Sequence, residues 1–261
     1  MARAQGSDRR LGLSRRAIVT HPSRETLFDD AAAQIATAID TACRARDRAL
    51  VILTGGSTIP PVYERLARSA VVDWNRVELF WSDERCVPPD HPDSNYGMAR
   101  DVLLEPAGVP QANVHRFKGE DSDSDRAAAI YAAEIEATLA NDAPRFDLTV
   151  LGMGADAHVA SLFPGHPLIE ETERWAGAVS ADDFDVPEPA IDRLTLTPRA
   201  FHATREVLLV VTGANKAPAV RAVLGTVRDP ARWPAQLVDG PDSRVSWLLD
   251  GDAAAEIDSE P

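Results

Sequence analysis

The sequence has few cysteines, and none has a spacing typical of a metal site. Its 261 residues contain two, Cys43 and Cys86, which lie far apart in the chain. A disulfide framework is therefore not expected, and two free thiols suit a reducing compartment. No apolar run approaches the length of a transmembrane helix, and the residues after Met1 lack the apolar core of a secretory signal. We expect a cytoplasmic protein.

Positive charge is also scarce. The sequence has 27 Lys and Arg residues against 41 Asp and Glu, which gives a formal net charge of −14. So acidic a chain argues against nucleic acid or an anionic membrane as a partner. If the ligand is a small anion, a local positive pocket must form against the field of the whole protein. Each Lys or Arg directly after a strand is therefore a candidate ligand.

Several sequence signatures of known chemistry are missing. There is no Gly-x-Ser-x-Gly motif, which argues against a serine hydrolase, and no Gly-Lys-Ser/Thr ending of a phosphate-binding P-loop. The spacing of Gly152, Gly154 and Ala157 matches the dinucleotide-binding fingerprint, but that fingerprint requires a full helix after it. Pro164 and Pro167 limit any such helix to about two turns. Nucleotide binding is therefore not favoured.

The sequence instead contains alternating apolar strands and amphipathic helices, with no linker or repeat dividing it. Strands are predicted at 17–20, 49–53, 77–81, 146–151, 194–197, 206–211 and 245–249, and helices at 24–46, 60–70, 96–104, 125–139 and 216–224. Residues 165–191 are predicted to be irregular. This alternation predicts βαβ units and a mainly parallel sheet. We expect one domain over 12–250, with flexible tails at 1–11 and 251–261.

Polar or glycine-rich turns follow four of these strands, at Thr54–Thr58, Ser82–Arg85, Gly152–His158 and Gly213–Lys216. Right-handed crossovers bring the carboxyl ends of parallel strands to one edge of a sheet. Ligands of open α/β sheets bind at that edge. The four turns are therefore predicted to form one site.

The turn after strand 146–151 carries the residues for acid–base chemistry. Gly152 and Gly154 allow a tight turn and a close approach to a ligand. A carboxylate two residues from a histidine can hold the ring and select its tautomer, which suggests that Asp156 orients His158 as a base. The alternative is that His158 is a structural or surface residue. A metal site with His166 is not favoured, because no regular helical face joins these side chains.

The other turns carry groups that suit an anion. Backbone N–H groups and two hydroxyls lie at a predicted helix start, and Lys216 lies where a cation opposes the helix dipole. Arg85 either binds a phosphate or forms a surface ion pair with Asp83 or Glu84. The predicted anion ligands are Gly55, Gly56, Ser57 and Thr58, together with Arg85, Lys216 and, on a weaker case, Arg193.

Taken together, these segments resemble the 6-phosphogluconolactonase family, which is related to the glucosamine-6-phosphate deaminases. The matching stretches are Leu53–Thr58, Phe80–Arg85, Val87–Pro88, Ser94–Tyr96, Gly152–Gly165, Arg193–Thr197 and Gly213–Lys216. The resemblance implies a three-layer α/β/α fold with a Rossmann-like, mainly parallel sheet of the NagB/RpiA/CoA transferase-like type. It also implies hydrolysis of 6-phospho-D-glucono-1,5-lactone to 6-phosphogluconate, the second step of the oxidative pentose phosphate pathway, with no metal or organic cofactor.

The hypothesis that follows assigns roles to these residues. Arg85 and Lys216 hold the phosphate with the amides of Gly55–Thr58, and His158, oriented by Asp156, activates water. N–H groups of the turn that contains Gly152 and Gly154 meet the oxyanion. The partner is a small sugar phosphate, and the chain is expected to be a monomer or a weak homodimer.

Two residues depart from the family pattern Asp-Gly-His-Thr, since Ala157 and Val159 replace the glycine and the threonine. If that glycine position needs a positive φ, Ala157 is strained by roughly 1 kcal/mol or more. A sugar-phosphate binding protein without turnover is therefore the alternative function. A deaminase is a further alternative, but Leu162–Pro164 replaces the Asn-Glu-Pro of that branch, which favours the lactonase branch.

Overall fold

The structure, a computed structural model, describes residues 16–140, 145–184 and 186–257. Its centre is a six-stranded, all-parallel sheet in the order β1-β9-β8-β5-β2-β3. Its strands are β1 (Arg16–His21), β2 (Ala49–Leu53), β3 (Val77–Trp81), β5 (Phe146–Leu151), β8 (Thr204–Val211) and β9 (Arg244–Asp250). The predicted parallel sheet is therefore confirmed, with β2, β3 and β5 at the predicted residues.

A second, antiparallel sheet has the order β4-β7-β6 and corrects two predictions. It consists of β4 (Asp83–Arg85), β7 (Arg193–Leu196) and β6 (Ala176–Val179). Most of the predicted Ser82–Arg85 turn is thus a strand, and the predicted irregular segment 165–191 contains β6. A strand of three or four residues is too short for an alternation of apolar and polar residues to be recognised in the sequence. The strands with which these segments pair are also remote in sequence.

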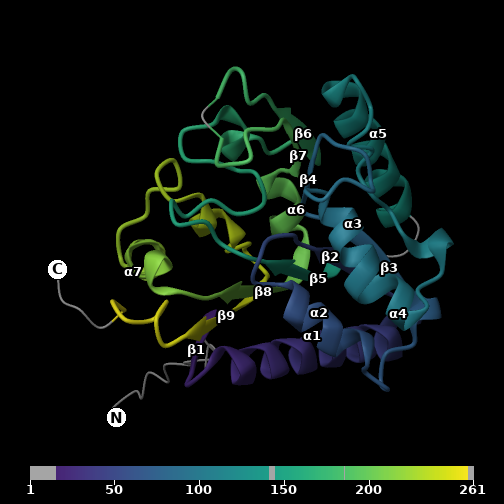
Figure 1. Cartoon of the computed structure of the whole chain (residues 1–261), viewed down its shortest axis with the longest axis horizontal. Helices are drawn as coiled ribbons and strands as arrows, with labels where there is room; N and C mark the ends of the chain where they lie inside the picture. Colours follow the sequence, from purple (N-terminus) through teal and green to yellow (C-terminus); the bar gives the residue numbers. More distant parts are fainter. Residues whose placement is uncertain (1–15, 141–144, 185, 258–261) are drawn as a thin grey trace, which may run out of the picture.

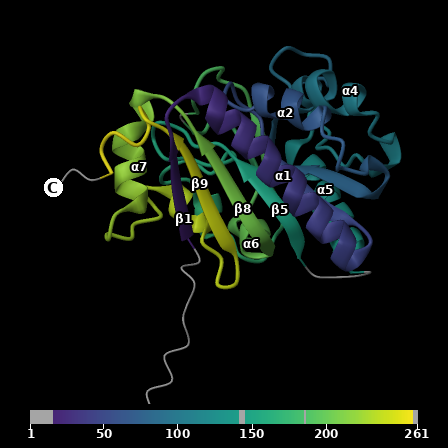
Figure 2. The same cartoon turned by 90° about the horizontal axis from the view of Figure 1, so that it is seen from below.

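Helices cover both faces of the main sheet. They are α1 (Arg24–Arg46), α2 (Pro60–Ala67), α3 (Asn95–Ala99), α4 (Glu105–Ala107), α5 (Ser124–Leu139), α6 (Pro198–His202) and α7 (Ala217–Leu224), with a π-helical turn at Arg100–Leu104 and 3₁₀ turns at Trp74–Arg76, Gln111–Asn113, Pro167–Glu170, Ala214–Lys216 and Pro234–Val238. α1 crosses one face (Figure 2), while α6 and the small sheet lie on the opposite side (Figure 1). The architecture is the predicted three-layer α/β/α fold.

The pattern of apolar residues explains these layers. Every residue of β2 and β5 is buried, as expected for central strands covered on both faces. α1 begins where the side chain of Ser23 accepts a hydrogen bond from the N–H of Thr26, and it ends at Asp47 with φ 66°. Its buried residues recur at helical spacing and pack on the sheet. The core therefore fills both faces of the central strands, and buried residues of α5, α6 and α7 belong to it as well as those of α1.

The register of the parallel strands fixes the position of the four turns. Leu53 pairs with Trp81, Leu151 with Leu209, and Val211 with Leu249, so the carboxyl ends of the neighbouring strands β8, β5, β2 and β3 meet at one edge. This is the edge that the sequence analysis predicted for the site.

The predicted domain limits and tails are only partly within the described residues. Residues 251–257 form turns, and Ala253 among them is fully buried. The predicted tail at 1–11 lies outside the described residues, as do 258–261, so the limits 12–250 stay a prediction. No helix in the described part of the chain has the length and apolar character needed to cross a membrane.

Candidate active site

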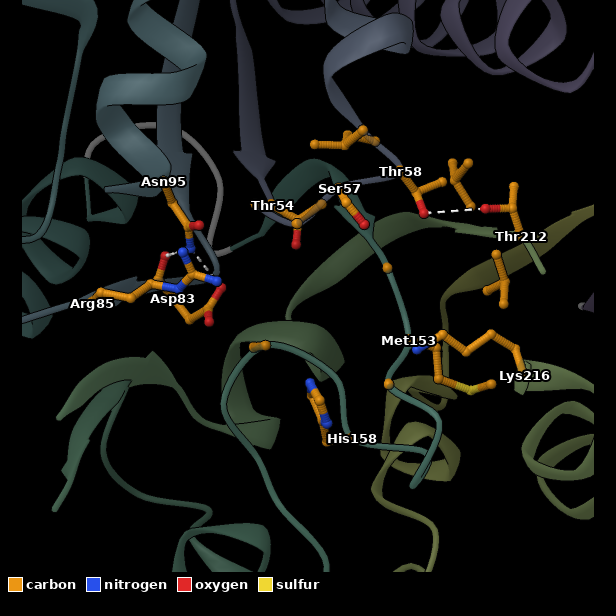
Figure 3. A pocket seen from close by; sticks show the side chains of 18 residues that line it. Thr54, Ser57, Thr58, Asp83, Arg85, Asn95, Met153, His158, Thr212 and Lys216 are labelled. Carbon is orange, nitrogen blue, oxygen red and sulfur yellow. Dashed lines mark hydrogen bonds between the residues drawn. The ribbon is translucent and has the colours of Figure 1, made fainter. Parts of the chain in front are cut away.

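One pocket lies at the carboxyl edge of the main sheet and unites the four turns (Figure 3). It is lined by Thr54–Ile59, Asp83, Arg85, Asn95, Gly152–Gly154, His158, Ala160, Val210–Thr212 and Lys216. Figure 3 shows Arg85 and Lys216 on opposite sides, with His158 between them. The three side chains that the hypothesis requires in a single site therefore line the same pocket.

His158 and Asp156 form a hydrogen-bonded pair. Nδ1 of His158 lies 2.6 Å from Oδ1 of Asp156, and the His158 ring packs edge-on against Phe163. If Nδ1 carries the proton, Nε2 is left with a lone pair, as a general base requires. Burial alone would raise the pKa of Asp156, but the hydrogen bond and charge of His158 outweigh it and lower that pKa. Asp156 is therefore well suited to stabilise a protonated imidazole.

The backbone around this pair is tightly turned. The N–H of Gly154 donates to the carbonyl of His158 over 2.9 Å, and the N–H of Ala157 donates to the carbonyl of Gly154 over 3.1 Å. A Cβ on Gly154 would lie 2.1 Å from His158 Nδ1 and 2.4 Å from Asp156 Oδ1, so only glycine fits there. Ala157 has φ 67° and Ala160 has φ 50°. The position occupied by Ala157 thus has the positive φ that favours glycine.

At one end of the pocket, Arg85 keeps hydrogen-bonding capacity for a ligand. Its Nη1 donates to the carbonyl of Asp93 over 2.6 Å, and no hydrogen bond is made by its Nη2 among the described residues. Arg85 forms no ion pair with Asp83 or Glu84 in this part of the structure, so the surface-pair alternative is not supported. Instead, the carboxylate of Glu84 accepts the backbone N–H of Arg85 over 2.8 Å.

Glu84 also fixes the position of Asn95, which was not predicted as a site residue. Its buried carboxylate accepts hydrogen bonds from the backbone N–H groups of Asn95 and Tyr96 and from the Ser94 hydroxyl, which anchors the start of α3. Burial raises the pKa of Glu84, although these N–H donors oppose the shift. Asn95 consequently faces the pocket against Gly55, where a Cβ would lie 1.8 Å from its Oδ1.

At the other end, Lys216, Thr58 and Thr212 line the pocket. The hydroxyls of Thr58 and Thr212 are 3.2 Å apart and connect the turns after β2 and β8 (Figure 3). Burial lowers the pKa of the Lys216 amine, while Asp156 opposes that shift. The sequence contains only one other lysine, Lys118, against 25 arginines. A half-buried amine at a helix start is therefore a distinctive feature of this pocket.

Arg193 is not among the residues that line the pocket. It is 4% exposed, and its Nη2 donates to the carbonyls of Pro187 and Pro189 over 3.1 and 2.7 Å. It pairs with Arg85 across β7 and β4, and burial followed by the charge of Arg85 lowers its pKa. Arg193 thus supports the wall that carries Arg85.

Other lining residues were also not selected from the sequence. Asp83 is nearly buried, and its Oδ2 accepts a hydrogen bond from the Ser161 hydroxyl over 2.8 Å. Asp83 and Thr212 lie within or beside the predicted turns, so proximity to those turns was the available signal, while Asn95 belongs to the stretch Ser94–Tyr96 that was matched only through the family resemblance. Among the described residues, no group of three or more His, Cys, Asp or Glu side chains is arranged to hold a metal ion.

The fold and the pocket together define an α/β protein with a pocket at the carboxyl edge of its sheet that two cations, Arg85 and Lys216, line. The family model for glucosamine-6-phosphate isomerases and 6-phosphogluconolactonase matches residues 22–247. The chain therefore belongs to the glucosamine-6-phosphate isomerase/6-phosphogluconolactonase family.

Individual relatives resemble the chain over most of its length. The 6-phosphogluconolactonase of Mycobacterium tuberculosis is 39% identical over 245 residues, covering 91% of this chain and 97% of that protein. The crystal structure of 6-phosphogluconolactonase from Thermotoga maritima matches with a TM-score of 0.79 and 29% identity, over 90% of this chain and 99% of the other. A monomeric glucosamine-6-phosphate deaminase shares the fold, with a TM-score of 0.77 at 20% identity, over 92% and 99%.

Proposed function

We propose that this protein is an enzyme that hydrolyses 6-phospho-D-glucono-1,5-lactone to 6-phosphogluconate. One observation carries the proposal: His158, which is hydrogen-bonded to Asp156, lies between two cations in a single pocket. The names of the relatives support the same activity. The substrate has an anionic phosphate at one end and an ester carbonyl at the other, which matches a pocket with a cationic end and a base.

The phosphate binds at the end formed by Lys216 and the turn Gly55–Thr58. The side chain of Lys216 supplies a positive charge, and the turn supplies backbone N–H groups and hydroxyls at the start of α2. Arg85 lies across the pocket from Lys216. We therefore assign it to the lactone end, in place of the role at the phosphate that the sequence suggested. This arrangement uses phosphate binding to orient the distant carbonyl.

His158 acts as the general base. Its Nε2 accepts a proton from a water molecule whose oxygen attacks the lactone carbonyl, and Asp156 stabilises the imidazolium. The tetrahedral intermediate then collapses with cleavage of the bond between the carbonyl carbon and the ring oxygen. The imidazolium returns its proton to that oxygen, which gives the open-chain acid. Water is the only co-reactant.

Arg85 is the group best suited to stabilise the oxyanion. The sequence suggested N–H groups of the turn that contains Gly152 and Gly154 for that role. However, the N–H groups of Gly154 and Ala157 are used within the turn itself. The guanidinium of Arg85 has donors available and lies at the lactone end, so it can meet the developing charge.

Replacement of the base tests this mechanism. We expect His158→Ala to lower kcat by about 10²–10⁴-fold, the range for loss of a general base, while a thermal melt shows an intact fold. The assay follows acid release from the phosphorylated lactone and subtracts spontaneous hydrolysis. A wild-type protein that binds 6-phosphogluconate without accelerating hydrolysis would establish the binding-protein alternative, and ammonia release from glucosamine 6-phosphate would establish a deaminase.

Replacement of Lys216, the residue proposed to bind the phosphate, provides an independent test. Lys216→Ala should mainly raise KM, by about tenfold or more for a lost charge-assisted contact, and should change kcat much less. Glucono-1,5-lactone without phosphate is the control substrate, and the variant should affect its turnover little. A KM equal to that of the wild type would exclude Lys216 from the phosphate site.

We also propose that the enzyme works in the cytoplasm as a monomer or a weak homodimer. Both cysteines are free thiols, which suits a reducing compartment. The edge strand β1 exposes Ile18 and Val19, a surface suited to weak self-association. Sedimentation over a range of concentrations checks the oligomeric state, and a stable tetramer would contradict it.

A further inference from the structure

Asp250, at the carboxyl end of β9, is a buried carboxylate that the proposed reaction does not use. It is 4% exposed and lies outside the residues that line the pocket. Its two oxygens accept hydrogen bonds from the N–H of Gly213 over 3.0 and 3.1 Å. They also accept the N–H of Ala253 over 2.8 Å and Nε of Arg24 over 3.2 Å. Each oxygen therefore has two hydrogen-bond donors.

The register of the sheet places Asp250 directly beside the segment that contains Gly213. Val211 on β8 pairs with Leu249 on β9, so the next residues of the two strands, Thr212 and Asp250, emerge side by side. Gly213 follows with φ 100°, a conformation that L side chains rarely adopt. Its carbonyl accepts the N–H of Lys216 over 3.0 Å, which closes the 3₁₀ turn that carries this lysine.

We propose that Asp250 is a positioning residue for Lys216, and hence a determinant of affinity for the phosphate group of the substrate. Its carboxylate holds Gly213 in its unusual conformation, and Gly213 sets the direction of the turn from which Lys216 enters the pocket. Arg24, at the start of α1, helps to hold the carboxylate in place. The proposal depends on the assignment of Lys216 to the phosphate.

The test is Asp250→Asn, which keeps the size of the side chain but replaces one acceptor oxygen with an NH₂ group. We expect KM for the phosphorylated lactone, and Kd for 6-phosphogluconate measured by calorimetry, to rise about tenfold, as for loss of a charge-assisted contact. We expect kcat to change less than about twofold, since the variant leaves His158 and Asp156 in place. Turnover of unphosphorylated glucono-1,5-lactone should stay the same.

Asp147 provides a matched control. It is similarly buried, with 7% exposure, and its carboxylate also accepts a backbone N–H, from Leu50, and an arginine, Arg46. It lies near the amino end of β5, at the opposite edge of the sheet from the pocket. Asp147→Asn should lower thermal stability as Asp250→Asn does, but it should leave KM and Kd within about twofold of the wild type.

A double variant decides whether Asp250 acts through Lys216. In the Lys216→Ala background, Asp250→Asn should add no further increase in KM, because the side chain that it positions is gone. A full additional increase there, or a wild-type KM in the single variant, would overturn the proposal. If Asp250→Asn does not fold, Gly213→Ala perturbs the same turn through its φ, and an unchanged KM in that variant is equally decisive.

The outcome is separable from that of the proposed function. A wild-type protein without lactonase activity would refute the enzyme, while the Kd for 6-phosphogluconate would still report whether Asp250 governs the phosphate end.

Discussion

Strain in this protein is located beside the histidine that we propose as the general base. Ala157 and Ala160 both have positive φ, and they flank the segment that carries His158 and Val159. Non-glycine residues in this conformation persist where the surrounding structure forces them, which is common at functional sites. Here the carbonyl of Ala157 accepts the N–H of Ala235 over 2.9 Å, so tertiary contacts hold the strained turn. This strained turn places the His158 ring against Asp156.

Ala157→Gly should relieve this strain. The gain in the free energy of unfolding is up to about 1 kcal/mol, because removing the Cβ penalty outweighs the added entropy of the unfolded chain. For a protein of this size, the melting temperature should rise by about 2–4 °C. The control is Ala155→Gly, a neighbour without a positive φ, which should lower or leave unchanged the melting temperature. Equal shifts in the two variants would show that φ is not the cause.

Addition of a Cβ at Gly154 tests how closely the side chains of His158 and Asp156 pack against this turn. In Gly154→Ala the new Cβ would overlap both His158 and Asp156, so the pair must separate. We expect kcat to fall by about 10²-fold or more, as for impaired general-base catalysis. Gly152→Ala is the comparison, since its Cβ would meet nothing within 4 Å, and its loss should be far smaller. Similar losses in the two variants would argue against the proposed His158–Asp156 geometry.

At the scale of elements, a histidine joins β3 to α5. Nδ1 of His115 lies 2.7 Å from Glu134 on α5, and its Nε2 lies 3.2 Å from Glu78 on β3. The ring also stacks on Phe80 with centroids 4.4 Å apart. Burial alone would lower the pKa of His115, but the two glutamates outweigh it and raise that pKa. The protonated form is therefore favoured in the folded protein.

This network predicts a pH-dependent part of the stability. Since the folded pKa of His115 is raised, its stabilisation is fully present below the unfolded value of about 6.5 and is lost as pH rises through the folded pKa. His115→Gln should therefore destabilise most near pH 6 and progressively less at higher pH. Urea unfolding of both proteins over that range measures the difference. A pH-independent difference would contradict it, and the more exposed His91→Gln is the control.

The elements also show what the sequence could predict. β2, β3 and β5 were predicted to the residue, because buried central strands are short apolar runs with clear ends. β4 and β6 were missed because their stability comes from pairing with β7, which is remote in sequence. The same long-range pairing explains Arg193. Its position just before Thr195 and Thr197 suggested a ligand, while cross-strand pairing buries it beside Arg85.

The site residues were likewise predictable where local sequence patterns place them, and not where long-range contacts do. His158, Arg85 and Lys216 were found because each directly follows a strand, and parallel topology then brings them together. Asn95 was not predicted because contacts outside its own segment bring it to the pocket: the buried Glu84 accepts its backbone N–H, and the carbonyl of Asp83 accepts its side-chain amide. Such a contact depends on the folding of a loop, for which the sequence carries no periodic signal.

At the scale of the whole molecule, ligand binding should raise the stability of the entire fold. The pocket is built from turns after four strands, so a ligand that joins them stabilises the folded state by mass action. At a hundred times its Kd, 6-phosphogluconate should contribute about 2.7 kcal/mol and raise the melting temperature by roughly 5–10 °C. Gluconate without phosphate should give a much smaller shift in a thermal melt. Equal shifts would show that the phosphate is not recognised.

The pairing of the first and last strands of the sheet has a practical consequence. Arg16 of β1 lies opposite Val245, and His21 lies opposite Asp250, so the chain enters the sheet at the edge away from the pocket and leaves it beside the pocket. If the protein were attached to a solid support through a tag ahead of Arg16, the pocket would face away from the support and toward the solution. A bulky fusion after residue 257 would instead extend from the edge of the sheet that carries the pocket, next to α7, where Glu256 pairs with Arg221.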